Sequence, residues 1–286
     1  MARILIAGCG DVGTSLGKAL IESGHYVVGL RRNLPIEKMG IRFIAVDLRD
    51  PSTLAGMDTD FDQVFFMAAP EQHDLSAYKE IYEVGLKNLL HTFSKSQHNP
   101  HWISVSSTSV YGQVNGEWVD ENSLTEPVKF NGQLQLLSEQ RVLAENKNNL
   151  VVRFAGIYGP GRKRLLRKAQ KGGPIQHEPP YYTNRIHKED CAGVLKFLFE
   201  KRVNGEKLHS HYLASDDLPA SMWEVVTWIA KQLKCKPPEI KQADKATTQN
   251  KRCCNKRLKE LGYRFQYPTY KEGFPQLIHE FNSTQS

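Results

Sequence analysis

The chain has 286 residues, of which 40% are hydrophobic and 24% are charged, and its formal net charge at pH 7 is +7. This apolar content excludes a largely disordered chain, because it is enough to offset the entropy lost on folding, and no apolar run approaches the roughly 20 residues of a membrane-spanning helix. The positive charge is spread along the chain, so it favours small anionic ligands over nucleic acid and serves equally well as solubilising charge.

Short apolar runs alternate with helical spacings in the first part of the chain. Residues 3–7 and 26–30 are apolar runs that predict strands, and the spacing of apolar residues at 16–20 predicts a helix between them. Further strands are expected at residues 43–46, 64–69, 102–106 and 150–154. Near-continuous apolar strands separated by helices are typical of a parallel sheet covered on both faces. We therefore predict a doubly wound α/β sheet of the Rossmann type over residues 1–161.

The amino-acid composition of the chain changes after Gly159-Pro160-Gly161. Basic residues, prolines and paired tyrosines follow, and helical spacings appear near residues 189–201 and 220–234. We expect residues 162–286 to form mainly a smaller C-terminal lobe that binds a substrate. Elements near residues 185–213 are expected to return to the sheet of the first domain.

A glycine-rich turn follows the first predicted strand and opens the first predicted helix. Its sequence is Gly8-Cys9-Gly10-Asp11-Val12-Gly13, the G-x-G-x-x-G spacing of dinucleotide-binding folds. Gly8 allows the tight turn, Gly10 lets the backbone approach a pyrophosphate, and Gly13 lets helix and strand pack closely. The helix N-terminus offers free N–H groups to the anion, and Asp11 and Val12 lie beside it. The turn therefore predicts a bound dinucleotide.

The end of the second predicted strand indicates which dinucleotide is bound. An NAD-selective site usually carries Asp or Glu there to accept hydrogen bonds from the adenosine ribose, whereas this chain has Arg31 and Arg32. Guanidinium groups suit a 2′-phosphate. We therefore predict NADP as the cofactor, with NAD as an alternative, although two solvated arginines would give the same pattern.

Residues at the ends of three further strands complete the predicted cofactor site. Asp47 ends the third strand, where its carboxylate suits the adenine amino group or, alternatively, caps the following turn. Small side chains at Ala68 and Ala69 close the fourth strand and are compatible with a cofactor lying across the strand ends or with core packing. Leu48, next to Asp47, and Ser106, in the fifth strand, are also predicted to contact the cofactor.

Several motifs in this order resemble the extended short-chain dehydrogenase/reductase superfamily, and in particular the NAD-dependent epimerase/dehydratase group and its atypical members. Besides the glycine turn, they are residues 46–50 (VDLRD), 84–90 (VGLKNLL), 105–112 (VSSTSVYG), 157–161 (IYGPG) and 184–190 (NRIHKED). The resemblance covers most of the chain. It implies hydride transfer at C4 of a nicotinamide ring, in an oxidoreductase or an enzyme that modifies a nucleotide sugar.

The resemblance implies a catalytic role for Ser107, whose counterpart in the family orients the substrate. A hydroxyl group at this position would polarise a carbonyl oxygen of the substrate. Alternatively, serines at strand ends satisfy local backbone groups. The family's acid/base tyrosine and lysine lie in a P-x-x-x-Y-x-x-x-K-x-x-x-E pattern. Anchored on Pro127 and Glu139, these two positions are Asn131 and Gln135 here. Neither side chain can exchange a proton at working pH, so the usual Tyr/Lys pair is missing.

The resemblance also implies substrate contacts for Thr108, Asn184 and Arg185, and the guanidinium of Arg185 suits a phosphate. Six positive charges lie within residues 162–171, close after the sixth strand. A phosphate-bearing ligand such as a nucleotide sugar would suit this run, although a solvated helix face explains it equally well. Nucleic-acid binding would require interleaved aromatic residues, which the run lacks.

Cysteine usage favours a reducing compartment. The odd number of cysteines lacks C-x-x-C spacing, and no basic and apolar leader precedes the first strand; the cysteines are Cys9, Cys191, Cys235, Cys253 and Cys254. We therefore expect a cytoplasmic protein. We expect no metal, because His209 and His211 have no second ligand pair at zinc-site spacing.

Two functions from different classes fit the sequence. The first is an NAD(P)-dependent oxidoreductase or epimerase/dehydratase-like enzyme acting on a small molecule without the usual Tyr/Lys pair. The second is a catalytically silent NADP(H)-binding sensor or scaffold. The retained Ser-rich segment favours the enzyme, and Asn131 and Gln135 favour the sensor. A homodimer is compatible with the sequence, which defines neither the oligomeric state nor the substrate.

Overall fold

The structure is a computed structural model and describes residues 1–36, 39–94, 96, 98–243 and 249–283. The chain divides into two compact units. The first unit comprises Met1–Val110, Pro127–Arg153 and Ala192–Tyr212, and the second comprises Tyr111–Glu126, Phe154–Cys191 and Leu213–Ser286. Each unit is therefore assembled from three separate stretches of sequence.

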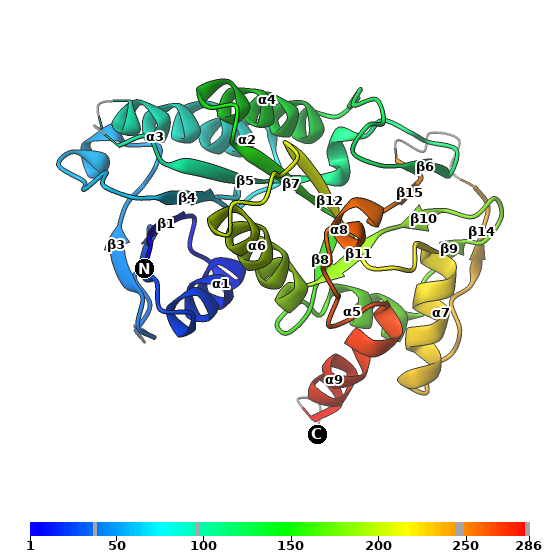
Figure 1. The fold of residues 1–286 in the computed structure, drawn as a ribbon. Helices are drawn as coiled ribbons and strands as arrows, with labels where there is room; N and C mark the ends of the chain where they lie inside the picture. Colours follow the sequence, from blue (N-terminus) through cyan, green and yellow to red (C-terminus); the bar gives the residue numbers. More distant parts are fainter. Residues whose placement is uncertain (37–38, 95, 97, 244–248, 284–286) are drawn as a thin grey trace. The chain divides into compact units, whose positions relative to one another are not determined.

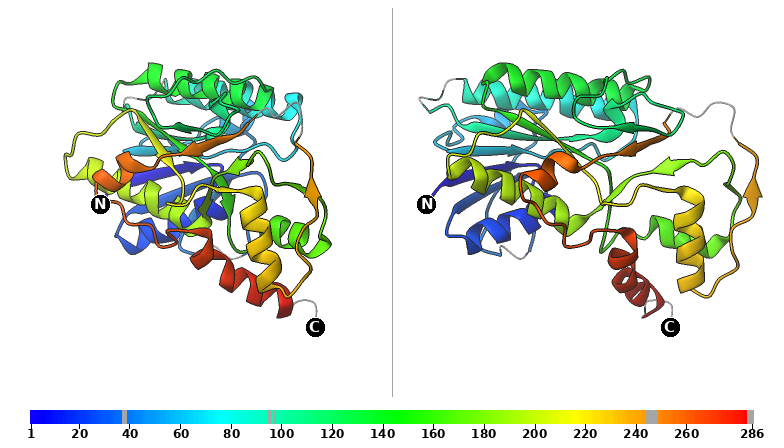
Figure 2. Two further views of the ribbon diagram at one scale, coloured as in Figure 1. Left: turned by 90° about the vertical axis from the view of Figure 1, so that its right-hand side faces the viewer. Right: turned by 45° about the vertical axis from the view of Figure 1, so that its right-hand side comes forward.

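Seven strands of the described residues form one parallel sheet, drawn in Figures 1 and 2. In the order in which they lie across the sheet they are β12 (His211–Ala214), β7 (Leu150–Phe154), β5 (His101–Ser107), β4 (Gln63–Phe66), β1 (Arg3–Ala7), β2 (Tyr26–Arg31) and β3 (Arg42–Ala45). The strand order runs from β1 to β3 in one direction and from β4 onward in the other. This reversal defines a doubly wound fold, so the predicted fold class is confirmed.

Helices cover both faces of this sheet. Figures 1 and 2 show α1 and α6 on one face and α2, α3 and α4 on the other. The α-helices are α1 (Asp11–Glu22), α2 (Leu75–Lys79), α3 (Leu86–Phe93), α4 (Phe130–Glu145) and α6 (Lys188–Val203). The π-helix η2 (Glu80–Gly85) joins α2 to α3, and η1 (Pro51–Leu54) and η3 (Thr108–Val110) are short 3-10 helices. No helix in the described part of the chain is long and apolar enough to cross a membrane.

The apolar runs of the sequence become the buried strands. Ile4, Leu5 and Ile6 of β1 are fully buried, and Leu5 packs in one core cluster with residues of β4 and α3, including Val64 and Leu86. Burial of apolar surface of this kind is the main favourable contribution to folding. The central strands of the sheet therefore provide a rigid support for the residues at their carboxyl ends.

The second unit contains short strand pairs and a helical core. Its elements are β6 (Glu117–Val119), β8 (Gly156–Tyr158), α5 (Arg164–Lys171), β9 (Ile175–Gln176), β10 (Tyr182–Thr183), β11 (Arg185–His187), β13 (Ala220–Ser221), α7 (Met222–Gln232), β14 (Ile240–Lys241), β15 (Lys251–Cys253), α8 (Lys256–Glu260) and α9 (Tyr270–Ser283). Strands β8 and β11 pair in parallel. Leu166 of α5, Val225 of α7 and Phe274 of α9 share one core cluster. The helices expected near residues 189–201 and 220–234 are present as α6 and α7.

Candidate functional site

The turn between β1 and α1 has a backbone that only glycine tolerates at its first position. Gly8 has a φ of +86°, and a Cβ atom there would lie 2.3 Å from the backbone nitrogen of Ala68. A side chain at this position would therefore be strained and would also collide with the segment that follows β4. The glycine turn and the end of β4 are thus in direct backbone contact.

The other two glycines of the turn have different surroundings. A Cβ atom on Gly10 would have the carbonyl oxygen of Gly8, at 4.0 Å, as its nearest neighbour, so a ligand can approach the backbone here. A Cβ atom on Gly13 would lie 3.2 Å from Cγ2 of Ile6, which shows that α1 packs closely on β1.

The N-terminus of α1 is suited to an anion. Gly10 is the N-cap residue, and no side chain makes a capping hydrogen bond there. Asp11 accepts a hydrogen bond of 2.8 Å from the backbone N–H of Val12. Uncapped amide groups and the positive end of the helix dipole favour negative charge. The open backbone at Gly10 and this helix end together fit a pyrophosphate.

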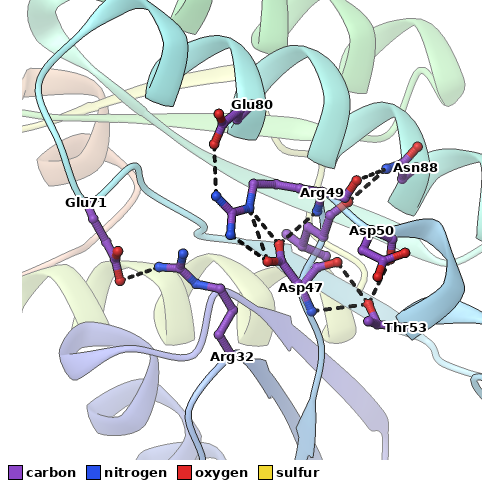
Figure 3. Close-up of polar contacts among 9 residues, drawn as sticks. Arg32, Asp47, Arg49, Asp50, Thr53, Glu71, Glu80 and Asn88 are labelled. Carbon is purple, nitrogen blue, oxygen red and sulfur yellow. Dashed lines mark hydrogen bonds and ion pairs between the residues drawn. The ribbon is translucent and has the colours of Figure 1, made fainter.

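The two arginines at the end of β2 have different partners. The guanidinium carbon of Arg31 lies 6.0 Å from the ring centroid of Phe43, on the neighbouring strand β3. Arg32 forms an ion pair with Glu71, which belongs to the segment following β4. Both side chains of this pair reach solvent, since they are 34% and 70% exposed. Figure 3 shows the pair beside a second polar cluster.

The second cluster is centred on Asp47 and Arg49. The Asp47 carboxylate accepts hydrogen bonds from Nη2 of Arg49 at 2.6 Å and from Nε at 2.9 Å, and Nη1 of Arg49 donates to Glu80 at 2.9 Å (Figure 3). The hydrogen bonds from Arg49 lower the pKa of the Asp47 carboxyl group. Asp50, rather than Asp47, caps the turn η1, accepting from the backbone N–H of Ser52 at 2.9 Å.

A hollow of about 330 Å³ lies next to these clusters. Its walls include Ala69 and Pro70, which follow β4, and the charged side chains already described. The lining residues are Arg32, Arg49, Ala69, Pro70, Glu71, Gln72, Asp74, Ser76, Ala77, Glu80 and Ile81. Leu48 is buried beneath this region, and its carbonyl oxygen accepts a hydrogen bond of 2.9 Å from the side-chain amide of Asn88.

Ser106, near the end of β5, belongs to a buried polar network. Its hydroxyl donates to Oε1 of Glu139 at 2.5 Å. Glu139 also pairs with Arg153 of β7, whose Nη2 donates to Oε2 at 2.7 Å. The side chains of Glu139 and Arg153 are 1% and 4% exposed. The Ser106 hydroxyl is therefore held in place by α4 and β7.

Ser107 is the last residue of β5, and Thr108 is the first residue of η3. The Ser107 oxygen accepts a hydrogen bond of 3.1 Å from the backbone N–H of Ser109. This contact matches the local backbone role that strand-end serines often have. It uses the oxygen as an acceptor, so the O–H proton stays available for donation to another group.

Asn131 and Gln135 are on successive turns of α4 and carry buried oxygens. The Gln135 Nε2 group donates to the hydroxyl of Tyr82 at 2.7 Å. Within the described residues, Oε1 of Gln135 and Oδ1 of Asn131 are buried without a hydrogen-bond partner. An unsatisfied buried polar atom costs about 1–3 kcal/mol. These two oxygens therefore carry an unused acceptor capacity in the positions of the family's tyrosine and lysine.

Tyr82 does not supply the missing acid/base group. Its side chain is buried in the core of the first unit, and burial raises the pKa of its hydroxyl well above the usual value. The Gln135 amide next to it carries no charge that would reverse this shift. The pair is thus electrically neutral at all ordinary pH values.

The second unit contains Asn184 and Arg185. Both polar groups of the Asn184 side chain hold the backbone of β15: Nδ2 donates to the Lys251 carbonyl at 2.9 Å, and Oδ1 accepts from the N–H of Cys253 at 2.7 Å. Arg185 is 3% exposed, and its Nη2 donates to the carbonyl of Thr183 at 2.9 Å. Burial lowers the pKa of this guanidinium.

Arg185 faces an unusual carboxyl group. Asp216 is 1% exposed, and burial raises its pKa to about 7, against the opposing effect of the Arg185 charge. In the part of the chain that the structure describes, Nη1 of Arg185 and Oδ2 of Asp216 are buried without hydrogen-bond partners. The pair therefore retains one unpaired donor and one unpaired acceptor in the interior of this unit.

The basic run predicted from the sequence surrounds a second hollow, of about 780 Å³. Helix α5 buries Leu166 and Ala169 and directs its charged residues to the other side. The hollow is lined by Ile157, Gly161, Arg162, Lys163, Arg164, Arg167, Lys168 and Lys171. No acidic side chain is among these residues, so the hollow favours anions.

Sequence reasoning did not identify several residues of these clusters as site residues. Arg49 belonged to the quoted VDLRD motif, and Glu139 served only as an anchor of the tyrosine/lysine pattern. Glu71 and Arg153 carried no local signal, because their partners, Arg32 and Glu139, lie far from them in the sequence. Among the described residues no group of three or more His, Cys, Asp or Glu side chains is arranged to hold a metal ion.

The fold and the glycine turn define an NAD(P)-binding fold of the epimerase/dehydratase type. A Methylobacillus flagellatus protein described as an NAD-dependent epimerase/dehydratase is 33% identical, with a TM-score of 0.82 over 98% of this chain and 99% of that one. MoeE5, solved in complex with UDP-glucose and NAD, has a TM-score of 0.80 over 99% of this chain and 100% of its own, and at 22% identity it shows the fold alone.

The chain can also be assigned to a family. The model of the RmlD substrate binding domain matches residues 2–283, and the chain therefore belongs to that family. The Escherichia coli K12 protein YeeZ is 26% identical over 287 residues, an alignment that covers 94% of this chain and 97% of YeeZ. The resemblance to the epimerase/dehydratase group that the sequence motifs indicated is confirmed.

Proposed function

We propose that this protein is an NADP(H)-binding oxidoreductase of the epimerase/dehydratase type that acts on a phosphate-bearing small molecule. The glycine turn carries the proposal, because the constrained Gly8, the open backbone at Gly10 and the uncapped start of α1 together fit a dinucleotide pyrophosphate. When bound, the cofactor would supply or accept a hydride at C4 of its nicotinamide ring.

The residues at the strand ends would each contact a different part of the cofactor. Arg31 and Arg32 supply positive charge for the 2′-phosphate of NADP. The buried oxygens of Asn131 and Gln135 would accept hydrogen bonds from ribose hydroxyls if cofactor binding exposes them. The Asp47 carboxylate stays ionised because Arg49 holds it, and an ionised carboxylate accepts from the adenine amino group.

Ser107 is the proposed polarising group. Its oxygen already accepts from the Ser109 backbone N–H, and a hydroxyl that accepts one hydrogen bond becomes a better donor. Donation to a substrate oxygen would stabilise negative charge that develops there. Proton transfer must then involve water, the substrate or another side chain, because Asn131 and Gln135 cannot exchange a proton.

The charge of the second unit supports a phosphate-bearing substrate. The basic hollow next to α5 and the buried Arg185 both favour an anion, and Thr108 and Asn184 remain proposed substrate contacts. MoeE5, a protein of the same fold, is bound to UDP-glucose, which makes a nucleotide sugar the first substrate class to test. A cytoplasmic location and a homodimer stay predictions.

A second candidate function is a cofactor-dependent sensor or scaffold without turnover. The missing Tyr/Lys pair favours it, because Asn131 carries no acidic hydroxyl and the amide of Gln135, which donates to the Tyr82 hydroxyl, carries no positive charge in place of the family's lysine. Such a protein would bind NADP(H) and change its affinity for a partner without transferring a hydride.

Fluorescence titration of the purified protein with NADPH and NADH tests the cofactor proposal. We expect saturable binding of NADPH, and weaker binding of NADPH in Gly10→Val, whose side chain would occupy the open backbone. Absence of binding by both dinucleotides would refute the proposal. Gly173→Val serves as a control, because Gly173 also has no close neighbour at its Cβ position and no positive φ but lies in the other unit.

Turnover distinguishes the two candidates. NADPH oxidation should be measured against a panel of carbonyl compounds and nucleotide sugars for the wild-type protein, Ser107→Ala and the control Ser94→Ala. The Ser94 hydroxyl donates to the carbonyl of His91 at the end of α3. The enzyme proposal expects a rate that falls by about 10²-fold or more in Ser107→Ala alone. Binding of NADPH without turnover of any panel member favours the sensor.

A further inference from the structure

The ion pair between Arg32 and Glu71 crosses the predicted cofactor site. Strand β1 lies between β2 and β4 in the sheet. Arg32 directly follows β2, and Glu71 belongs to the segment after β4. A contact between these two segments must therefore span the carboxyl end of β1, where the glycine turn begins. Figure 3 shows the two side chains meeting.

The other charged side chains around the adjoining hollow have partners of their own. Arg49 binds both Asp47 and Glu80, and the Asp74 carboxylate accepts a hydrogen bond from the backbone N–H of Ala77. Arg31 faces the ring of Phe43. Glu71 is thus the carboxylate in ion-pair contact with Arg32 in the part of the chain that the structure describes, whereas Asp47 acts on Arg32 only through its charge at longer range.

The chemistry of a carboxylate at this place has two consequences. A dinucleotide phosphate at Arg32 must displace Glu71 or tolerate a like charge beside it, and either effect weakens binding. A ribose 2′-hydroxyl, by contrast, can donate to a carboxylate, which is the contact that NAD-selective folds make with an acidic residue at the end of their second strand. Here that residue would come from the segment after β4.

We propose that Glu71 is a specificity-determining residue that restrains NADP(H) binding and lets the site accept NAD(H). This inference rests on the proposed cofactor function. In the NADP(H) complex the 2′-phosphate takes the place of the Glu71 carboxylate on Arg32. In the NAD(H) complex the ion pair persists, and Glu71 accepts from the ribose hydroxyl.

Dissociation constants of NADPH, NADH and 2′,5′-ADP for wild type and Glu71→Gln test the inference at one salt concentration. Because exposed ion pairs are weak, we expect Glu71→Gln to bind NADPH and 2′,5′-ADP about two- to fivefold more tightly. The affinity for NADH should not rise. In an Arg32→Ala background the same substitution should tighten NADPH binding less than in the wild type, since the competition for Arg32 is gone and only the repulsion between Glu71 and the phosphate is removed.

The control is Asp58→Asn, which makes the same change of charge in an exposed ion pair with Arg3, the first residue of β1. Arg3 lies at the opposite end of the strands, so NADPH binding should stay at the wild-type value. An equal gain in Asp58→Asn, or an unchanged ratio of the NADPH and NADH constants in Glu71→Gln, would overturn the role of Glu71 while leaving the cofactor proposal intact. Failure of the wild-type protein to bind either dinucleotide would overturn both.

Discussion

The buried ion pair between Glu139 and Arg153 anchors the end of β5, and we predict that breaking it strongly destabilises the protein. The two side chains are 1% and 4% exposed, and Arg153 donates through Nε at 3.0 Å and through Nη2 at 2.7 Å. Arg153→Met would retain most of the apolar volume but leave the Glu139 carboxylate buried without its main counter-charge. Removing one partner of a buried pair costs about 3–5 kcal/mol.

Urea unfolding followed by circular dichroism measures this loss. We expect the free energy of unfolding to fall by about 3–5 kcal/mol in Arg153→Met and to recover in part when Glu139→Gln is added, because the uncompensated charge is then removed. Lys256→Met is the control, since its ion pair with Glu260 is 3.4 Å long with side chains 75% and 65% exposed, and it should cost less than about 1 kcal/mol. A loss in Arg153→Met as small as in the control would refute the reasoning.

Three further predictions concern the glycine turn, the missing pair and the buried carboxyl group. Gly8→Ala should lose at least about 2 kcal/mol of stability, because φ would be strained and the new methyl group would clash with Ala68. Gly10→Ala, which has no close neighbour, should melt at the wild-type temperature. Equal melting temperatures of the two variants would contradict this. Asn131→Tyr combined with Gln135→Lys should raise turnover of an identified substrate by about 10²-fold or more in steady-state assays, and an unchanged rate would show that the acid/base pair is not what limits it. The folded-state pKa of Asp216 is raised from 3.8 to about 7, so the native state retains a proton that the unfolded state releases. The free energy of unfolding should therefore fall as the pH rises through this range. Urea unfolding at several pH values should show a smaller loss in Asp216→Asn.

The local signals in the sequence were sufficient for the fold and for the cofactor turn. Alternating apolar runs and helical spacings predicted the doubly wound sheet, and the spacing of Gly8, Gly10 and Gly13 predicted the turn after β1. These features depend on neighbours along the chain, because strand burial, helix periodicity and a positive φ are set within a few residues. The structure adds a second reason why this position needs glycine, because a Cβ atom on Gly8 would collide with the backbone of Ala68.

Residues whose role depends on distant partners gave a weaker signal. Arg32 was predicted to face a phosphate, but nothing in the sequence paired it with Glu71. Gln135 was recognised as a replacement for lysine, but its bond to the Tyr82 hydroxyl, 53 positions away, was not anticipated. Ser107 was singled out by resemblance, and its hydrogen bond from the backbone of Ser109 was one of the alternatives.

The sequence by itself determined that a parallel sheet is built and that a glycine turn opens its first helix. Only the tertiary structure decided which charges meet at the carboxyl ends of the strands. The physical reason is the strand order: because β1 separates β2 from β4, residues that follow these two strands become neighbours across the turn. In this way Glu71 reaches Arg32, and Arg153 of β7 likewise reaches Glu139 of α4.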